Sequence, residues 1–257
     1  MLIKNAYIDR VHKILFFWSP KVACTSIANW FLWQVLSEST RATLDLSISS
    51  DARVLLKEHM FLLDSRDLKR QDLSDYKKIA FVRNPYDRAV SAFCNKFIFN
   101  REKFLTTFDD LEEFAQDIYT LTADRSKAYA GLSFLQFLEN VKNQIAAGHP
   151  VDHHWAPQQR VSICAAQYDY IFPIEEMAKA NHMINDLIGK ETEIKNFNKM
   201  TYAEQEGLFD GPVSQLSSLE IAMKGVTPDK KYFLNSETKN LIVEIYKNDF
   251  IDLGYPY

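Results

Sequence analysis

Two short segments carry the cationic and hydroxyl side chains that bind phosphate groups in proteins. The first, residues 19–26, has the sequence SPKVACTS and combines Lys21 with the hydroxyls of Thr25 and Ser26. A helix starting here would add unpaired backbone N–H groups and the positive end of its dipole. The segment has no glycine, and Lys21 precedes Thr25 by four positions, so it is not a Walker A sequence. We expect an anion-binding turn; a helix capped by Thr25 or Ser26 beside an exposed lysine is the alternative.

The second segment, residues 81–91, has the sequence FVRNPYDRAVS. Asn84 suits a helix N-cap and Pro85 suits the first helical position. Ser91 would then lie two turns into the helix, where its hydroxyl could reach a phosphate that the Arg83 guanidinium also holds. The alternative is a surface ion pair, either Arg83 with Asp87 or Asp87 with its neighbour in the chain, Arg88.

Histidines and one glutamate offer acid–base chemistry. An imidazole is a common general base, which makes His59 a candidate. Glu58 is an alternative base, because neighbours on a strand point to opposite faces and only one of the two can face a site. His154 is a third candidate. Together with His149 and His153 it suggests a metal site, but the spacing is not a zinc pattern and no metal is expected.

The cysteines indicate a reducing compartment. Cys24, Cys94 and Cys164 are too few and too widely spaced for a disulfide framework, and no CxxC pair is present. Cys24 adjoins the expected helix start, where the pKa of a thiol can fall, but we expect it to pack under the turn and not to act as a nucleophile. The expected location is cytoplasmic.

Composition bounds the class of protein. The 257 residues fit a single domain over residues 1–257, with 47% hydrophobic and 25% charged residues. Thirty Lys and Arg against 34 Asp and Glu give a net charge of −4, which disfavours a dedicated nucleic-acid binder. The longest uncharged stretch, residues 22–37, contains polar residues and is shorter than the roughly 20 apolar residues of a membrane span. Neither a transmembrane segment nor a signal peptide is expected.

The elements that position these residues alternate between strands and helices, which favours an α/β fold with a parallel sheet. Lys21, His59 and Arg83 each follow an expected strand, and ligands of such sheets bind at the carboxyl ends of the strands. These residues would therefore share one site. The expected strands are residues 13–18, 53–59, 78–82 and 168–172, and the expected helices are residues 25–36, 109–119, 134–145, 236–250 and one that begins at Pro85.

In this order, the two anion-binding segments resemble those of the sulfotransferases. Residues 20–26, PKVACTS, are similar to the family's 5′-phosphosulfate loop, and residues 83–93, RNPYDRAVSAF, to its 3′-phosphate element. Residues 154–158, HWAPQ, resemble a motif of the chondroitin-type carbohydrate sulfotransferases. Residues 245–255 are similar to the C-terminal helix of that group. The resemblance thus touches four places between residue 20 and the end of the chain.

This resemblance implies a P-loop-like three-layer α/β fold with a central parallel sheet flanked by helices. It implies an enzyme that transfers a sulfuryl group from 3′-phosphoadenosine 5′-phosphosulfate (PAPS) to a hydroxyl of an acceptor and releases the product PAP without a metal. The expected acceptor is a carbohydrate. Animal members usually carry a membrane anchor, which is not expected here. By position, Arg83 and Ser91 hold the 3′-phosphate, and the 5′-phosphosulfate is held by Lys21, Val22, Ala23, Cys24, Thr25 and Ser26.

The expected chemistry is electrostatic, because charge moves onto the leaving oxygen as the sulfuryl group departs. Lys21 would stabilise that charge. His59 is the preferred base, since the related heparan sulfate 2-O-sulfotransferases carry a catalytic histidine at this position, while Glu58 and His154 stay open. His154 is also a candidate for acceptor binding, and Trp155 for stacking on a sugar. Two alternatives to a sulfotransferase stay open: a P-loop nucleotide kinase or NTPase, and a non-catalytic nucleotide-binding module.

Overall fold

The structure is a computed structural model that describes residues 5–99, 115–116, 118–119, 121–123, 131–158, 167–195, 209 and 211–257. The chain forms two compact units. The first, called the sheet unit, comprises Met1–Arg83 and Gln158–Lys199. The second, called the helical unit, comprises Asn84–Pro157 and Met200–Tyr257. The single domain expected over residues 1–257 stays a prediction.

A five-stranded sheet forms the centre of the sheet unit, with the strand order β3-β1-β2-β4-β5. Strands β2, β4 and β5 are parallel, as predicted, whereas β1 runs antiparallel to both β2 and β3. The prediction of a wholly parallel sheet is therefore wrong at this edge. A short turn links β1 to β2, and parallel neighbours need a far longer crossover. The strands are β1 (Ala6–Asp9), β2 (Ile14–Trp18), β3 (Leu62–Leu63), β4 (Lys77–Val82) and β5 (Tyr170–Pro173).

The strand predicted for residues 53–59 is wrong, because these residues belong to helix α3 (Ala52–Glu58). The Asp51 side chain accepts a hydrogen bond from the backbone N–H of Arg53 and caps the helix. Leu55 and Leu56 are buried, whereas Val54 is exposed, which is a helical pattern of burial. His59 is the C-cap of this helix and does not lie at a strand end.

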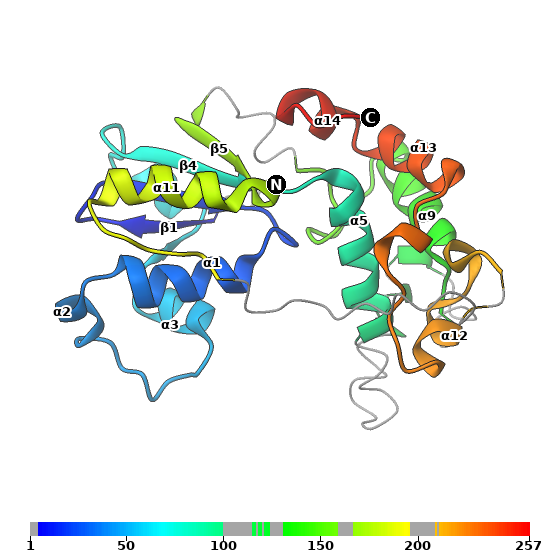
Figure 1. The fold of residues 1–257 in the computed structure, drawn as a ribbon, viewed down its shortest axis with the longest axis horizontal. Helices are drawn as coiled ribbons and strands as arrows, with labels where there is room; N and C mark the ends of the chain where they lie inside the picture. The colour runs from blue at the N-terminus through cyan, green and yellow to red at the C-terminus, as the bar shows by residue number, and fades with distance from the viewer. Residues whose placement is uncertain are drawn as a thin grey trace. The chain divides into compact units, whose positions relative to one another are not determined.

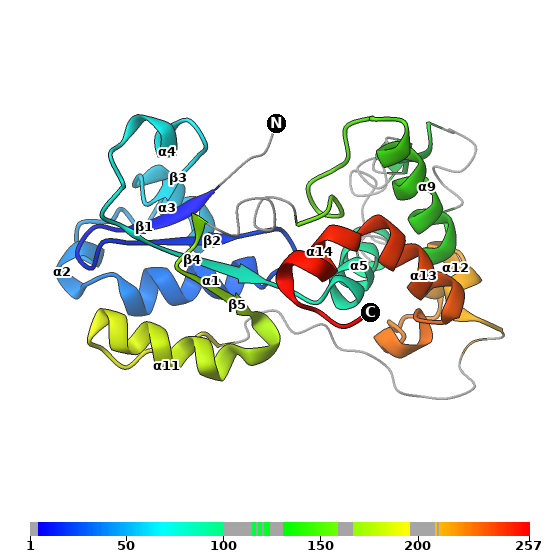
Figure 2. The same ribbon diagram turned by 90° about the horizontal axis from the view of Figure 1, so that it is seen from above.

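Three helices pack with one face of the sheet in a single apolar cluster. They are α1 (Cys24–Trp30), which continues into a π-helical turn (Phe31–Val35), α3 and α11 (Met177–Ile188). Phe16, Phe81 and Phe172 of the sheet are buried in the same cluster. Figures 1 and 2 show the sheet with α1 and α11 beside it.

The opposite face of the sheet carries Leu15 and Phe17, which line a pocket of about 560 Å³ together with Leu68 of α4 (Asp67–Arg70). None of the candidate site residues lines this pocket. The helix-flanked sheet of a mixed α/β fold is confirmed.

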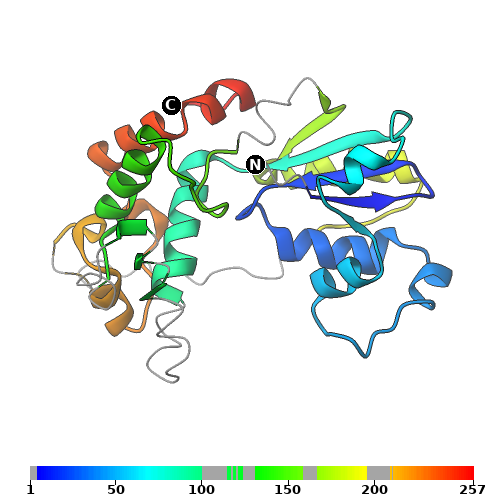
Figure 3. The ribbon, with the colours of Figure 1, turned by 180° about the vertical axis from the view of Figure 1, so that it is seen from behind.

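Helix α5 (Pro85–Phe93) begins as predicted, with Asn84 as its N-cap and Pro85 in the first turn. In the helical unit, Phe93 on this helix packs against Phe134 and Phe137 of α9 (Phe134–Ala146), with ring centroids 5.3 and 5.6 Å away. Helix α9, drawn green, lies beside α13 (Ser236–Ile245), drawn orange-red (Figures 1 and 3). These aromatic side chains form part of the hydrophobic core of the helical unit.

The remaining helices agree in part with the sequence. The helix expected at residues 134–145 is α9 (Phe134–Ala146), and the one expected at 236–250 is divided at Tyr246 into α13 (Ser236–Ile245) and α14 (Lys247–Leu253). The helix expected at 109–119 falls largely outside the described residues. Other short helices are α2 (Glu38–Arg41), α12 (Ser218–Met223), a π-helical turn (Cys94–Phe99) and 3₁₀ turns at Ile174–Glu176, Val213–Gln215 and Lys230–Tyr232. None of the helices within the described ranges has the length and apolar character that crossing a bilayer requires.

Candidate functional site

The turn between β2 and α1 contains two residues in the left-handed conformation. Lys21 has φ of 69° and Ala23 has φ of 48°. This conformation costs an L-residue with a side chain on the order of 1–3 kcal/mol. Alternation of handedness along a turn directs successive backbone N–H groups toward the same side and forms an anion-binding concavity. The backbone strain therefore lies within residues 19–26, the segment that the sequence predicts to bind a phosphate group.

The start of α1 has no side-chain cap. Ala23 is the N-cap and its side chain offers no hydrogen bond to the first turn, so the alternative of a helix capped by Thr25 or Ser26 is wrong. The Cys24 thiol donates to the carbonyl of Ser19 at 3.5 Å. Burial raises the pKa of the Cys24 thiol and outweighs the hydrogen bonds and the Lys21 charge that lower it. Cys24 is thus suited to packing under the turn and not to nucleophilic attack.

Arg83 follows β4 and is joined to the turn. Its guanidinium Nη1 donates to the carbonyl of Lys21 at 3.0 Å. The structure therefore brings Lys21 and Arg83 together at the ends of two parallel strands, β2 and β4. A guanidinium has five N–H donors, so this bond leaves it able to bind a phosphate as well.

Gln158 connects the same two strand ends and was not predicted as a site residue. It is fully buried. Its Oε1 accepts from the backbone N–H of Arg83 and from the hydroxyl of Ser19, both at 3.2 Å. Its Nε2 donates to the carbonyl of Arg83 at 2.8 Å. Gln158 is the last residue of the HWAPQ segment, so the resemblance of that segment to the sulfotransferase motif is the sequence signal that points to it.

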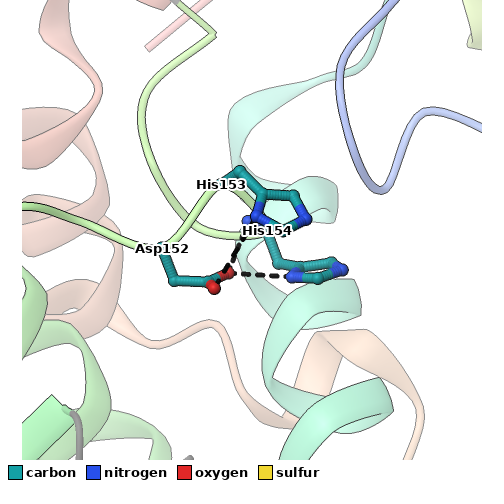
Figure 4. Close-up of side chains that lie close together, drawn as sticks. All are labelled: Asp152, His153 and His154. Carbon is teal, nitrogen blue, oxygen red and sulfur yellow. Dashed lines mark hydrogen bonds and ion pairs between the residues drawn. The ribbon is translucent and has the colours of Figure 1, made fainter. Parts of the chain in front are cut away.

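Asp152, His153 and His154 form a compact polar cluster in the helical unit (Figure 4). Nδ1 of His154 lies 2.8 Å from Oδ1 of Asp152, and the same oxygen accepts from the backbone N–H of His154 at 2.8 Å. Nδ1 of His153 lies farther away, 3.7 Å from Oδ2. Partial burial raises the pKa of the Asp152 carboxyl, but the hydrogen bonds and charge of the histidines outweigh it and hold that pKa at about 2. Asp152 is therefore an anion at neutral pH.

The same three side chains have one ligand atom each within 4.8 Å of one another, so they are the group that could hold a metal ion among the described residues. The set of possible metal ligands considered from the sequence was His149, His153 and His154, and it did not include Asp152. The expectation of a reaction without metal stays a prediction.

Buried polar side chains fix the loop that carries this cluster. Arg88, which is 2% exposed, donates from Nη1 to the carbonyl of Ala156 at 2.8 Å and from Nη2 to the carbonyl of His153 at 3.4 Å. The Tyr246 hydroxyl donates to the carbonyl of Trp155 at 2.7 Å. Arg88 therefore supports the loop, and the surface pair suggested for it is wrong. Its neighbour Asp87 pairs with Lys230 of the 3₁₀ turn Lys230–Tyr232.

The contacts of the other predicted site residues give little support for the roles suggested for them. Glu58 is exposed on α3. Nε2 of His59 accepts a hydrogen bond from the backbone N–H of Asp45 at 3.1 Å. Ser91 is buried on α5 in the helical unit, and its joint role with Arg83 stays a prediction. Trp155 packs in the aromatic core, 5.7 Å from Phe137 between ring centroids, so the stacking role suggested for it has no support.

Comparison with known proteins places the turn and the Arg83 segment in context. The sequence profile of the Sulfotransferase family matches residues 4–256. The chain belongs to the sulfotransferase family. This confirms the resemblance carried by residues 20–26 and 83–93.

Individual relatives are carbohydrate sulfotransferases. The chain is 30% identical over 201 residues to carbohydrate sulfotransferase 12 of Mus musculus, which covers 68% of this chain and 46% of that protein. It is 26% identical over 201 residues to carbohydrate sulfotransferase 9 of Homo sapiens, covering 75% and 43%. With carbohydrate sulfotransferase 11 of Rattus norvegicus it is 25% identical over 257 residues, covering 98% and 67%. The chain thus spans less than half the length of the first two relatives. No solved structure gives a significant match.

The Gln158 bridge predicts a stability effect. Gln158→Leu keeps most of the side-chain volume but leaves the backbone N–H and carbonyl of Arg83 without their partner. We expect the free energy of unfolding to fall by about 1–3 kcal/mol, measured by urea denaturation. Gln71→Leu, at an exposed position, is the matched control and should change it by less than about 0.5 kcal/mol. Equal stability of the two variants would contradict the bridge.

Proposed function

We propose that this chain is an enzyme that transfers the sulfuryl group of PAPS to a hydroxyl of a carbohydrate acceptor. The observation that carries the proposal is the strained, uncapped turn before α1, with the Arg83 guanidinium hydrogen-bonded to the Lys21 carbonyl. The turn offers backbone N–H groups and a cation where an anionic nucleotide would bind. The family of the chain and the printed names of its relatives supply the chemistry and the acceptor class.

The proposed donor site follows the order of the elements. Lys21 and the backbone N–H groups of residues 22–26 bind the 5′-phosphosulfate in a P-loop-like arrangement of strand, turn and helix. Arg83 and Ser91 bind the 3′-phosphate. Ligands of α/β sheets bind at the carboxyl ends of parallel strands, which is where Lys21 and Arg83 lie.

The reaction is a displacement at sulfur. The acceptor oxygen forms a bond to sulfur as its proton passes to a base, and the bond from sulfur to the 5′-phosphate oxygen breaks. PAP leaves with that electron pair. Fixed donors around the leaving oxygen stabilise the charge that develops there, which is the role proposed for Lys21. No observation favours the kinase or the non-catalytic alternative, and the cytoplasmic location stays a prediction.

A binding and transfer assay tests the proposal. Isothermal titration with PAP should show one site, and labelled PAPS with a panel of oligosaccharides should give a labelled, sulfated product. Binding of ATP with magnesium in place of PAP would support the kinase alternative. A protein that binds neither PAP nor PAPS would refute the proposal.

Lys21→Ala separates leaving-group stabilisation from simple binding. We expect kcat to fall about 10²–10³-fold, as on loss of one donor to a developing anion. The affinity for PAP should fall much less, because the backbone N–H groups are retained. Lys179→Ala, at an exposed lysine on α11, is the control and should leave both quantities unchanged. A larger loss of PAP affinity than of kcat would make Lys21 a ground-state binding residue.

Arg83→Ala tests the 3′-phosphate assignment. PAP and adenosine 5′-phosphate differ only in the 3′-phosphate, so titrations with both isolate this group. We expect the variant to lose about 10- to 100-fold in affinity for PAP, as for a charge-assisted hydrogen bond worth roughly 1.5–3 kcal/mol, and little for adenosine 5′-phosphate. Equal losses for both nucleotides would mean that Arg83 acts by supporting the Lys21 turn.

A further inference from the structure

Asp152 and His154 are arranged as an acid–base pair. The Asp152 carboxylate accepts hydrogen bonds only, so its 2.8 Å contact fixes the proton of a neutral His154 ring on Nδ1. Nε2, at the far end of the ring, then carries a lone pair (Figure 4). Among the described residues this nitrogen has no hydrogen-bond partner, and the side chain is 25% exposed. The ring is therefore set to accept a proton from outside the protein.

The backbone around the ring is held from three directions. The carbonyl of Asp152 accepts from the backbone N–H groups of Trp155 and Ala156 and closes a tight turn. Arg88 and Tyr246 bind the carbonyls on that turn, as described above. The Trp155 ring, 2% exposed, anchors the turn in the aromatic core. A base held this rigidly keeps one orientation, which is what effective proton transfer requires.

The two competing bases lack these features. His59 uses the lone pair of Nε2 to accept from the backbone N–H of Asp45. The strand geometry that favoured His59 or Glu58 is absent, because both belong to the end of α3. Of the three candidates, His154 combines a fixed tautomer with an unused acceptor nitrogen.

We propose that His154 is the general base of sulfuryl transfer and that Asp152 is its positioning residue; this rests on the function proposed above. Nε2 of His154 takes the proton of the acceptor hydroxyl while the acceptor oxygen bonds to sulfur and PAP departs. The resulting imidazolium is stabilised by the Asp152 carboxylate and later releases its proton to water. Asp152 keeps its charge throughout.

A metal ion held by Nδ1 of His154 and the Asp152 carboxylate would replace this hydrogen bond. Nδ1 of His154 cannot donate its proton to Asp152 and ligate a metal at the same time. His153 would also be needed as a ligand, whereas the acid–base pair does not require it. Variants at His153 therefore separate the two interpretations.

The first test is the tautomer of His154, read from ¹⁵N chemical shifts of the imidazole in the free, full-length protein. Absence of one signal from His154→Gln assigns the ring among the six histidines. We expect an Nδ1–H tautomer in the wild type and a shift toward Nε2–H in Asp152→Ala. A tautomer unchanged by Asp152→Ala overturns the pair. This result does not depend on the acceptor or on activity, so it is distinct from failure of the proposed function.

The second test is a double-mutant cycle in kcat. We expect His154→Ala and Asp152→Ala each to lower kcat by about 10²–10³-fold, within the range for a general base, with PAP affinity retained. The double variant should be no slower than His154→Ala, because Asp152 acts only through the ring. A further tenfold loss in the double variant overturns the positioning role.

Two controls complete the cycle. Asp152→Asn keeps an acceptor for the backbone N–H of His154, so it preserves the turn if Asp152→Ala unfolds it; it should still lower kcat, since the carboxylate charge is lost. His153→Gln should keep wild-type kcat. If it instead loses activity that added zinc restores, the cluster is a metal site and the proposal is wrong.

Discussion

The turn between β2 and α1 imposes the constraint on which the rest of the sheet unit depends. Lys21 and Ala23 hold left-handed conformations that glycine would adopt at no steric cost. Such strain persists only where surrounding contacts over-determine it. Val22, between them, is completely buried. The Arg83 guanidinium holds the Lys21 carbonyl from the neighbouring strand. The turn is thus shaped by the sheet around it and not by its own residues.

Gln158 extends this constraint to the course of the chain. The chain leaves the sheet unit after Arg83 and returns to it at Gln158. The side-chain amide of Gln158 binds both the N–H and the carbonyl of Arg83. The points of exit and return are therefore fixed to each other within the sheet unit, beside Ser19 at the end of β2. One buried amide in this way organises the ends of β2 and β4, where the proposed donor site lies.

The sequence predicted elements well where local signals agree with burial, and poorly where they do not. β2 and β4 are continuous apolar runs, and Asn84 with Pro85 marks the start of α5 unambiguously. The run Val54–Leu56 is too short for its periodicity to separate strand from helix, and the Asp51 cap decided it. Strand β1 gives no such signal, because its four residues, AYID, end in a charged residue, Asp9, and form no continuous apolar run.

The candidate site shows the same limit. The charges of Lys21 and Arg83 near expected strand ends identify them as candidates from the sequence, and the structure connects them by a hydrogen bond. The roles of Gln158 and Arg88 cannot be identified in this way, because their partners are backbone groups 75 and 68 residues away in the sequence. Residue type alone gives no sign of such long-range contacts, whose energy comes from satisfying backbone groups that burial would otherwise leave unpaired.

The difference between the histidines follows from what a base needs. An imidazole ring is not sufficient by itself, since a lone pair already used by a backbone N–H is unavailable to a substrate, as at His59. A carboxylate on the opposite nitrogen supplies both the correct tautomer and stabilisation of the cation that forms. Asp152 provides this from two residues away in the sequence. Arg88 and Tyr246 support the loop through its carbonyls, whereas the Asp152 carboxylate binds both the backbone N–H and the ring of His154. The backbone contact needs only an acceptor oxygen and the ring needs the negative charge, so loss of structure and loss of the base are separable.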